Sequence, residues 1–420
     1  MKKAITASLN ETRVVKVVAE QHGTISYRQA FWVVAYAFAV TLLSSTLPTP
    51  LYVVYQHLWH FSSVTLSLIF ATYALGVLFA LLWFGRISDQ IGRRRVLLSG
   101  LIIAVCGAIL FVLAQNIVWL FAARFMTGIA VGLATGTATA TLVELYSGKD
   151  TRFAALIGTA SSAIGFGLGP LVTGLLAQYA PLPTHLVFFI YLVLLMLALF
   201  LTRGIPETVQ IRRVGETHWT LRPQRLSVPK EIRGPFVLAA ITLLCGFGTI
   251  GLFTALAPSL VINLLHMRNL AVSGSAVALI FAMMAIAQLS LRRLTIRQTI
   301  TVGMLLLITG LCLMLLAFAE QSLLLFLISI VFLGIGPGLA YMGSLELANR
   351  IAPSMHRAEV LSSYFVVGYL GNALPALGVG IAIGLIGSFN AIAAFVVVIG
   401  LLSLTLLISA LVQPRLTNPS

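Results

Sequence analysis

The sequence predicts an all-α polytopic membrane protein with twelve transmembrane helices in two pseudo-symmetric six-helix bundles. Three observations predict this fold class: the composition, the length of the apolar runs and an internal repeat. The chain has 420 residues, of which 59% are hydrophobic and 9% charged, and its mean hydropathy is +1.04. A soluble protein of this size could not cover its surface with so few polar residues. The composition therefore predicts an integral membrane protein.

The apolar runs are each about 20 residues long, which is the length that a helix needs to cross the hydrocarbon core. Strands of a membrane β-barrel would instead alternate over about 10 residues. In chain order, the predicted spans cover roughly residues 31–55, 62–84, 96–114, 116–143, 153–178, 183–202, 236–263, 271–290, 299–318, 322–347, 358–384 and 387–412.

A polar stretch rich in arginine, proline and threonine separates the sixth span from the seventh. The predicted organisation is therefore a cytoplasmic segment (1–30), a first bundle (31–202), a cytoplasmic linker (203–235), a second bundle (236–413) and a tail (414–420). The first segment lacks the continuous apolar core of a cleaved signal peptide, so the first span is predicted to direct the chain to the membrane.

The net charge of +15 is explained by topology. Nearly all lysine and arginine residues fall in segments that share one side of the membrane; the exceptions are Arg124, inside a span, and Arg268, in a loop on the other side. Cytoplasmic segments carry an excess of basic residues. We therefore expect a multi-pass protein of the cell inner membrane with both termini in the cytoplasm, and no nucleic-acid partner.

The sequence contains no pattern typical of a metal site, a cofactor site or an enzyme. Cys106, Cys245 and Cys312 lie inside apolar runs without CxxC spacing, so they are predicted to be free core residues. His57 and His60 could share a helix face but have no carboxylate or cysteine neighbour. No HExxH motif, nucleophile elbow or phosphate-binding loop occurs, and no polar segment is large enough for a catalytic domain.

The two predicted bundles repeat the same pattern of residues. Equivalent spacings occur in the fourth and tenth spans and in the fifth and eleventh: Gly132, Gly136 and Glu144 match Gly334, Gly338 and Glu346, while Arg152 and Pro170 match Arg357 and Pro375. Chance does not readily produce this order. It predicts two homologous bundles that can rock about a site near the middle of the membrane.

A charged turn between the second and third spans is the most informative motif of the chain. Residues 85–95 read Gly-Arg-Ile-Ser-Asp-Gln-Ile-Gly-Arg-Arg-Arg. The turn resembles the loop between the second and third helices of the major facilitator superfamily, with the pattern Gly-x-x-x-Asp-(Arg/Lys)-x-Gly-Arg-(Arg/Lys). The matching residues are Gly85, Asp89, Gly92, Arg93 and Arg94, whereas Gln90 stands where a base is usual. With the spans and the repeat, the resemblance covers essentially the whole chain and implies a transporter fold.

Two further motifs resemble those of particular branches of the superfamily. Arg124 with the glycines that follow it resembles the fourth-helix motif of the proton-linked branches. The fifth span resembles the motif typical of drug antiporters, although Thr173 replaces one of its glycines. Small residues of this kind are predicted to let helices pack closely and bend. They are Gly128, Gly132, Gly136, Gly165, Gly169, Pro170 and Gly174.

Arg124 is the only charged residue that the sequence places inside a span. A guanidinium there costs about 2.5 to 3.5 kcal/mol on insertion, so we expect it to face the cavity or a polar partner. Two roles stay open: coupling or recognition of an anionic group, and a structural hydrogen-bond hub. The first span lacks the aspartate that many drug antiporters carry, so no acidic residue stands out as the proton-coupling group.

Charged residues at adjacent cytoplasmic helix ends are predicted to form an inner gate. The set comprises Asp89, Arg93, Glu144 and Arg152, mirrored in the second half by Glu346 and Arg357, with Gly85, Gly92 and Arg94 completing the turn. We expect their ion pairs to hold the outward-open state and to break as the halves part on the cytoplasmic side. The alternative is a set of surface ion pairs, each worth less than about 1 kcal/mol.

By the superfamily pattern, the first, second, fourth, fifth, seventh, eighth, tenth and eleventh spans would line the substrate cavity. Their polar, aromatic and adaptable members are Tyr36, Ser45, Tyr73, Thr127, Phe253, Met283, Met284, Gln288, Tyr341, Tyr364, Tyr369 and Asn372. A cavity with few charges suits uncharged or amphipathic molecules better than sugar phosphates or dicarboxylates.

These observations predict a secondary active transporter that moves a small hydrophobic or amphipathic molecule across the inner membrane by alternating access. Proton-coupled efflux, driven by the proton gradient, is the first interpretation because of the fifth-helix motif. An uptake carrier or uniporter for a small metabolite is the alternative, since a fold alone does not separate the two. The expected partners are the substrate and the lipid bilayer, and the resemblance implies a monomer.

Overall fold

The computed structural model describes residues 24–85, 87–146, 152–209, 226–265, 269–353 and 356–412. Within these ranges the chain forms helices and no strand. Eleven helical stretches are long and apolar enough to cross a membrane, and one further apolar helix, α9 (Leu186–Thr202), is shorter. The prediction of an all-α polytopic membrane protein is confirmed.

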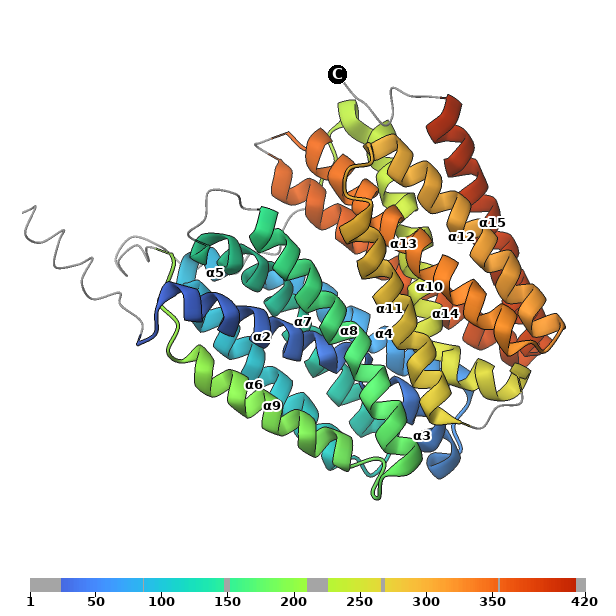
Figure 1. Cartoon of the computed structure of the whole chain (residues 1–420), viewed down its shortest axis with the longest axis horizontal. Helices are drawn as coiled ribbons and strands as arrows, with labels where there is room; N and C mark the ends of the chain where they lie inside the picture. Colours follow the sequence, from blue (N-terminus) through green and yellow to red (C-terminus); the bar gives the residue numbers. More distant parts are fainter. Residues whose placement is uncertain are drawn as a thin grey trace, which may run out of the picture.

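The helices form an N-terminal half and a C-terminal half (Figure 1). The elements of the N-terminal half are α2 (Tyr27–Thr46), η1 (Thr49–Leu51), α3 (Tyr52–Trp59), α4 (Ser63–Phe84), α5 (Ile87–Ile91), α6 (Arg93–Val112), α7 (Ile117–Leu145), α8 (Arg152–Tyr179) and α9. Those of the C-terminal half are η2 (Lys230–Ile232), α10 (Arg233–Leu265), α11 (Leu270–Ser290), α12 (Ile296–Ala319), α13 (Leu323–Ile351), α14 (Arg357–Ile386) and α15 (Ser388–Val412). The predicted tail, most of the N-terminal segment and residues 210–225 of the linker lie outside the described residues.

The first span is interrupted, where the sequence predicted a single helix over 31–55. α2 ends at Thr46, the 3-10 turn η1 follows, and α3 completes the span. Pro48 and Pro50 explain the interruption, because a proline has no N–H to donate within a helix. Carbonyl groups in the last turn of a helix lack partners from the following turn. The interruption therefore makes the Ser45 carbonyl available to a side chain in the middle of the bundle.

The two halves repeat the same pairs of packed helices. In the N-terminal half α2 packs on α8, α4 on α7, and α6 on both α7 and α9. In the C-terminal half α10 packs on α14, α11 on α13, and α12 on both α13 and α15. The order of the partners along the chain is the same in both halves, which agrees with the repeat seen in the sequence.

Glycines allow the closest of these contacts within each half. A Cβ built on Gly128 of α7 would lie 3.0 Å from the Cα of Gly76 in α4, and it would collide with the backbone oxygen of Tyr73. Gly132 packs on α4 in the same way, and Gly165 and Gly169 pack on α2. Gly136 differs from the prediction, because no atom lies within 4 Å of the position of its Cβ. It is one turn beyond the contact with α4 and provides no helix packing.

The halves touch each other at one end of the molecule, which we call the closed end. Gly174, near the end of α8, lies against Gly274 of α11, and a Cβ on either would come within 3.1 Å of the other's Cα. Nearby, Gly380 of α14 packs against Ser63 and Ser67 of α4. In Figure 1 the two halves diverge from this contact toward the upper left of the view.

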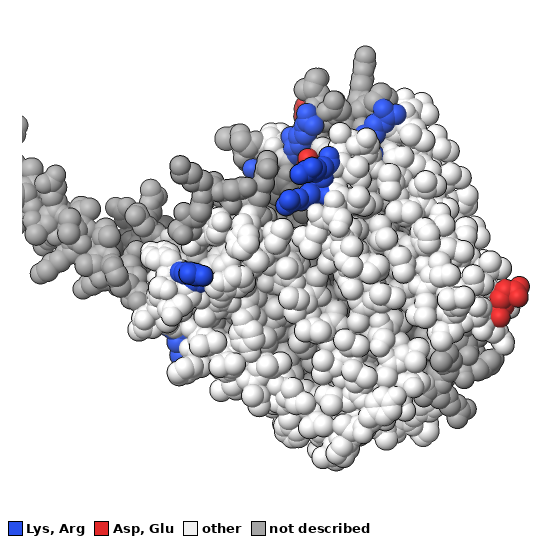
Figure 2. Space-filling view, viewed as in Figure 1, with Lys and Arg blue, Asp and Glu red and all other residues white. Residues whose placement is uncertain are grey.

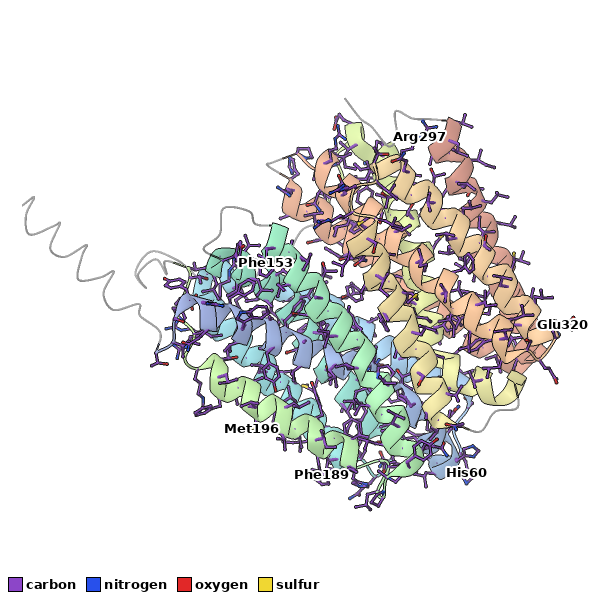
Figure 3. All side chains as sticks on the ribbon, viewed as in Figure 1. His60, Phe153, Phe189, Met196, Arg297 and Glu320 are labelled. Atoms are coloured by element: carbon purple, nitrogen blue, oxygen red, sulfur yellow. The ribbon has the colours of Figure 1, made fainter. Side chains whose placement is uncertain are left out.

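The other end carries most of the described basic residues, and we call it the basic end. Its basic side chains belong to Arg28, Arg93, Arg94, Arg95, Arg203, Lys230, Arg233, Arg292, Arg293, Arg297, Arg350 and Arg357. In Figure 2 blue atoms gather at the upper and left part of the molecule and the middle is almost entirely white. Figure 3 labels Phe153 and Arg297 at this end, and His60 at the opposite end. The two ends thus differ in their content of basic residues, as is usual for the two sides of a membrane-spanning protein.

Candidate functional site

A cavity of about 410 Å³ lies between the two halves. Its walls come from α2, α4, α7 and α8 on one side and from α10, α11, α13 and α14 on the other, the eight helices that the superfamily resemblance implies. The lining reaches Val143, Ala154 and Leu345 near the basic end, whereas Gly174 and Gly274 block the opposite direction. The cavity therefore opens toward the basic end, and its size suits a small molecule.

The cavity is aromatic and uncharged. None of the described residues that line it is acidic, basic or a histidine. Its rings belong to Phe38, Phe70, Tyr73, Phe166, Phe247, Phe281, Tyr341, Phe365 and Tyr369. Phe166 of α8 and Phe281 of α11 stack across the two halves, with 5.2 Å between the ring centroids. Such rings offer a large, rigid apolar surface to a ligand.

Two amides supply directional polar groups. Gln288 donates from Nε2 to the Gly338 carbonyl oxygen at 3.2 Å, and Asn372 donates from Nδ2 to the Phe247 carbonyl oxygen at 3.3 Å. Each primary amide has two N–H donors and an acceptor oxygen, so these bonds hold the amides in place while leaving capacity for a ligand.

The predicted cavity residues divide into two groups. Those that line the cavity are Ser45, Tyr73, Met284, Gln288, Tyr341, Tyr369 and Asn372. The others face their own half. The Tyr36 hydroxyl donates to the Leu194 carbonyl oxygen at 3.1 Å, and the Thr127 hydroxyl donates to the Arg124 carbonyl oxygen at 3.1 Å. Phe253 is buried with its ring 6.3 Å from that of Phe326, the buried Tyr364 hydroxyl lies 2.7 Å from that of Ser344, and Met283 packs against Gly334 of α13. These five are corrections to the sequence interpretation. A helix that is apolar on every side gives no periodic signal of the face that meets the cavity.

Arg124 lies directly behind the cavity wall. Its side chain is only 1% exposed, and Nη1 donates to the Ser45 carbonyl oxygen at 2.8 Å. Its guanidinium carbon lies 4.5 Å from the ring centroid of Tyr73 and 5.5 Å from that of Phe70, and both rings line the cavity. Cation–π contacts of this kind partly compensate a buried charge. Arg124 thus meets a polar partner and aromatic faces, without lining the cavity in this conformation.

Arg93 organises a charged cluster at the basic end. Its Nη1 lies 2.7 Å from Asp89 Oδ1 and donates to Ser88 Oγ at 2.6 Å. Its Nη2 lies 3.0 Å from Glu144 Oε1, and Glu144 also accepts a hydrogen bond from the Thr208 hydroxyl. The cluster joins α5, α6, the end of α7 and the segment after α9.

Glu207 completes this cluster and was missed in the sequence. Its Oε1 accepts a hydrogen bond from the backbone N–H of Arg93 at 2.7 Å, and its Oε2 accepts one from that of Arg94 at 3.2 Å. A carboxylate at this position caps the first turn of α6 and complements the helix dipole. Gly92 lies beside it with a φ of +103°, and a Cβ there would collide with the carboxylate. The only signal in the sequence was an acidic residue soon after the sixth span.

The predicted inner gate needs a first correction. Asp89, Arg93 and Glu144 all belong to the N-terminal half, and their ion pairs are formed while the cavity opens at the basic end. The expectation that these pairs break as the halves part is therefore wrong. Contacts inside one half do not change when the two halves move as rigid bodies.

The mirrored part of the gate needs a second correction. Arg357 donates from Nη2 to Asn349 Oδ1 at 3.0 Å, and among the described residues Glu346 is exposed and forms no ion pair. The two residues therefore do not pair as their equivalents were expected to do. The side chain of Arg152 lies outside the described residues, so its part in the gate stays a prediction.

Replacing Glu207 by alanine is expected to lower the free energy of unfolding by about 1 to 2 kcal/mol, since the first turn of α6 loses its cap. Thermal unfolding of the purified chain in detergent measures the change. Glu207→Gln retains one acceptor oxygen and should lose less. The matched control is Glu320→Gln, an exposed carboxylate at the end of α12. Equal melting temperatures for Glu207→Ala and the wild type would contradict the capping role.

Solved structures share the fold described above. A POT family transporter in complex with 5-aminolevulinic acid superposes with a TM-score of 0.74 at 14% identity, over 93% of this chain and 96% of that one. A bacterial homologue of the human lysosomal transporter Spinster, in an inward-facing and unoccupied conformation, gives a TM-score of 0.72 at 14% identity, over 95% of this chain and 100% of that one. At this level of identity the likeness concerns the fold alone.

Curated relatives match shorter stretches. The multidrug efflux protein YfmO of Bacillus subtilis (strain 168) is 29% identical over 157 residues, which are 37% of this chain and 39% of YfmO. An uncharacterized transporter of Rickettsia felis is 33% identical over 151 residues, 35% of each chain. The matched stretches thus span about two fifths or less of the length of these relatives.

One family model matches the greater part of the sequence. The model of the Major Facilitator Superfamily aligns with residues 31–376, which begin inside α2 and end inside α14, and so cover nearly all of the N-terminal half and most of the C-terminal half. Together with the twelve apolar helices, their repeated packing and the cavity between the halves, this match leads to one conclusion. The chain belongs to the Major Facilitator Superfamily and is a membrane transporter, not an enzyme.

Proposed function

We propose that the protein exports a small amphipathic molecule across the inner membrane by alternating access, driven by the proton gradient. The observation that carries this proposal is the aromatic, uncharged cavity between the halves, which opens toward the basic end. Aromatic rings would hold the apolar body of such a molecule, while Gln288 and Asn372 would orient its polar part.

The contacts between the halves support alternating access. They lie at the closed end, where α8 meets α11 and α4 meets α14. Two bundles that rock about a central site can exchange such a contact for one at the other end. Both bundles belong to one chain, and we propose that the protein acts as a monomer.

The basic residues support a cytoplasmic location for the basic end, by the preference of arginine and lysine for that side. Both termini would then lie in the cytoplasm, and the conformation described here would face the cytoplasm. An exporter takes up its substrate in that state. A cavity open to the cytoplasm is therefore consistent with loading from inside the cell.

Export is further supported by the similarity to YfmO, which its name describes as a multidrug efflux protein. Arg124 is the charged residue behind the cavity wall and our candidate for a role in coupling. A guanidinium stays protonated at physiological pH, so Arg124 would act through its charge and would not carry the proton itself.

Proteoliposomes with a pH-sensitive dye inside test this function. A pH gradient is imposed, and a panel of amphipathic compounds is screened for movement of the compound in exchange for protons. We expect coupled movement that is absent from protein-free liposomes. Movement of a compound without proton flux would contradict antiport and favour the uniporter or uptake carrier. Movement of no compound in the panel would contradict export of this substrate class.

A further inference from the structure

We propose that the transported molecule is an amphipathic monoanion whose carboxylate binds Arg124 once the Tyr73 ring has moved aside. This inference rests on the proposed transport function and narrows its substrate class. It concerns the same cavity, extended by the space that Tyr73 now fills.

The hydrogen bonds of Arg124 are incomplete. Nη1 donates to the Ser45 carbonyl oxygen, but Nε and Nη2 have no partner among the described residues, although the side chain is only 1% exposed. A guanidinium carries five N–H donors, and a buried charge without paired donors is costly. A residue that served only as a structural hub would be expected to use these donors. Arg124 instead lacks a partner on one side.

The two unpartnered nitrogens form one edge of the guanidinium, and that edge fits a carboxylate. The same pair of atoms does this elsewhere in the protein: Arg93 donates from Nε at 3.3 Å and from Nη2 at 3.0 Å to Glu144 Oε1. Bonds from two parallel N–H groups to a carboxylate are among the strongest that arginine forms. At Arg124 no carboxylate of the described chain occupies the equivalent place. An anion from outside the chain would fit this place.

One layer of side chains separates the Arg124 guanidinium from the cavity. Tyr73, Phe70 and Ser45 all contact Arg124, and all three line the cavity. Tyr73 is the nearest ring, 4.5 Å from the guanidinium carbon, and the space in front of it is the 410 Å³ cavity itself. A change of rotamer that swings this ring into the cavity would open a path from the ligand to Arg124.

The positive charge of Arg124 and the uncharged lining of the cavity favour an anionic ligand over a cationic or neutral one. No described residue of the lining is acidic, so an organic cation would find no counter-charge and would be repelled by Arg124. A neutral acceptor could bond to Nε or Nη2 but would leave the charge of the guanidinium uncompensated. One guanidinium can neutralise one carboxylate, so a dicarboxylate or a sugar phosphate would keep an unpaired charge in an apolar cavity. The aromatic rings would hold the rest of the molecule.

Binding of three matched compounds to the full-length protein in detergent tests this inference. We use 2-naphthoate, the neutral 2-naphthamide and the cation trimethyl(2-naphthyl)ammonium, which share one aromatic body, and measure affinity by calorimetry. We expect 2-naphthoate to bind about 10- to 100-fold more tightly than 2-naphthamide, the range for a hydrogen bond to a charged group. In Arg124→Gln this ratio should fall to about one. The matched control is Arg297→Gln, whose side chain bonds the end of α15 and should leave the ratio unchanged.

A second variant decides the matter if Arg124→Gln does not fold. In Tyr73→Ala the ring no longer covers Arg124, so no ring has to move before the carboxylate binds. The affinity for 2-naphthoate should therefore rise by about threefold or more, whereas the affinity for 2-naphthamide should not rise. Absence of 2-naphthoate binding, equal binding of the anion and the amide, or a preference unaffected by both variants overturns the inference. Transport of 2-naphthamide in proteoliposomes with no preference for 2-naphthoate would overturn the substrate class alone. Binding of 2-naphthoate without transport of any compound would instead contradict the proposed function.

Discussion

Gly274→Leu is expected to abolish transport while the chain remains folded. A Cβ at Gly274 would lie 3.0 Å from the Cα of Gly174 and would collide with the carbonyl oxygen of Pro170. Both contacts are with backbone atoms of α8, which belongs to the other half, and a backbone cannot rotate out of the way. The larger side chain therefore forces the halves apart at the closed end.

The expected size of this effect follows from the packing. Overpacking costs about 3 kcal/mol when the surroundings cannot relax, and that cost corresponds to a change of roughly 100-fold in the ratio of two conformations. A transporter that cannot close this end cannot complete the cycle of alternating access. We expect transport in proteoliposomes to fall by a similar factor.

Spin labels on cysteines introduced at Tyr179 and Leu385 measure the conformational change, in a background without the native cysteines. These exposed residues lie at the closed ends of α8 and α14, in different halves. The distance between the labels should increase in Gly274→Leu. The control is Gly378→Leu, on the same helix as the label at Leu385. No atom lies within 4 Å of the Cβ that this substitution adds. Wild-type transport and an unchanged distance in Gly274→Leu would show that the closed end does not depend on this contact.

Gly128→Leu is expected to destabilise the fold itself. Gly128 faces Gly76 across the contact of α7 with α4, inside the N-terminal half, and a Cβ would also lie 3.1 Å from the Val77 nitrogen. Here the two helices cannot separate by rocking, because they belong to one bundle. We expect a loss of about 3 kcal/mol or more and a melting temperature lower by about 3 °C or more.

Gly136→Leu is the matched control on the same helix. The position lies about two turns after Gly128 and has open space around its Cβ. Size-exclusion chromatography and thermal unfolding in detergent should give a wild-type result for this variant and aggregated or strongly destabilised protein for Gly128→Leu. Equal stability of the two variants would mean that α4 and α7 can move apart without cost.

The fold could be predicted from the sequence because its signals are local. Each span is a run of apolar residues, and its transfer into the bilayer is favourable whichever neighbouring helices it packs against. The break in the first span was not predicted, although Pro48 and Pro50 were visible. Its effect depends on whether the bundle supplies partners for the carbonyl groups at the end of α2, and the Arg124 guanidinium supplies one at Ser45.

The candidate site was predicted only in part. Polar residues such as Gln288 and Asn372 stood out against apolar helices, and the structure places them at the cavity. The phenylalanines that make up much of the lining were missed, because a phenylalanine faces lipid, core or cavity with the same sequence signature. The sequence also placed residues in the cavity that do not line it, among them Tyr36, Thr127 and Phe253. A polar or aromatic side chain in a span can equally form contacts within its own bundle, and these three do so.

The class of protein could be inferred from the sequence, through its apolar segments, its internal repeat and the charged turn of its superfamily. These properties belong to single segments and do not depend on how the helices are arranged. The packing of the helices was needed to show which end is closed, which side chains meet in the cavity, and that Glu207 caps α6 while Arg124 keeps an unpaired edge. The physical reason is that these contacts join residues far apart in the chain, on helices whose faces look alike until they are packed.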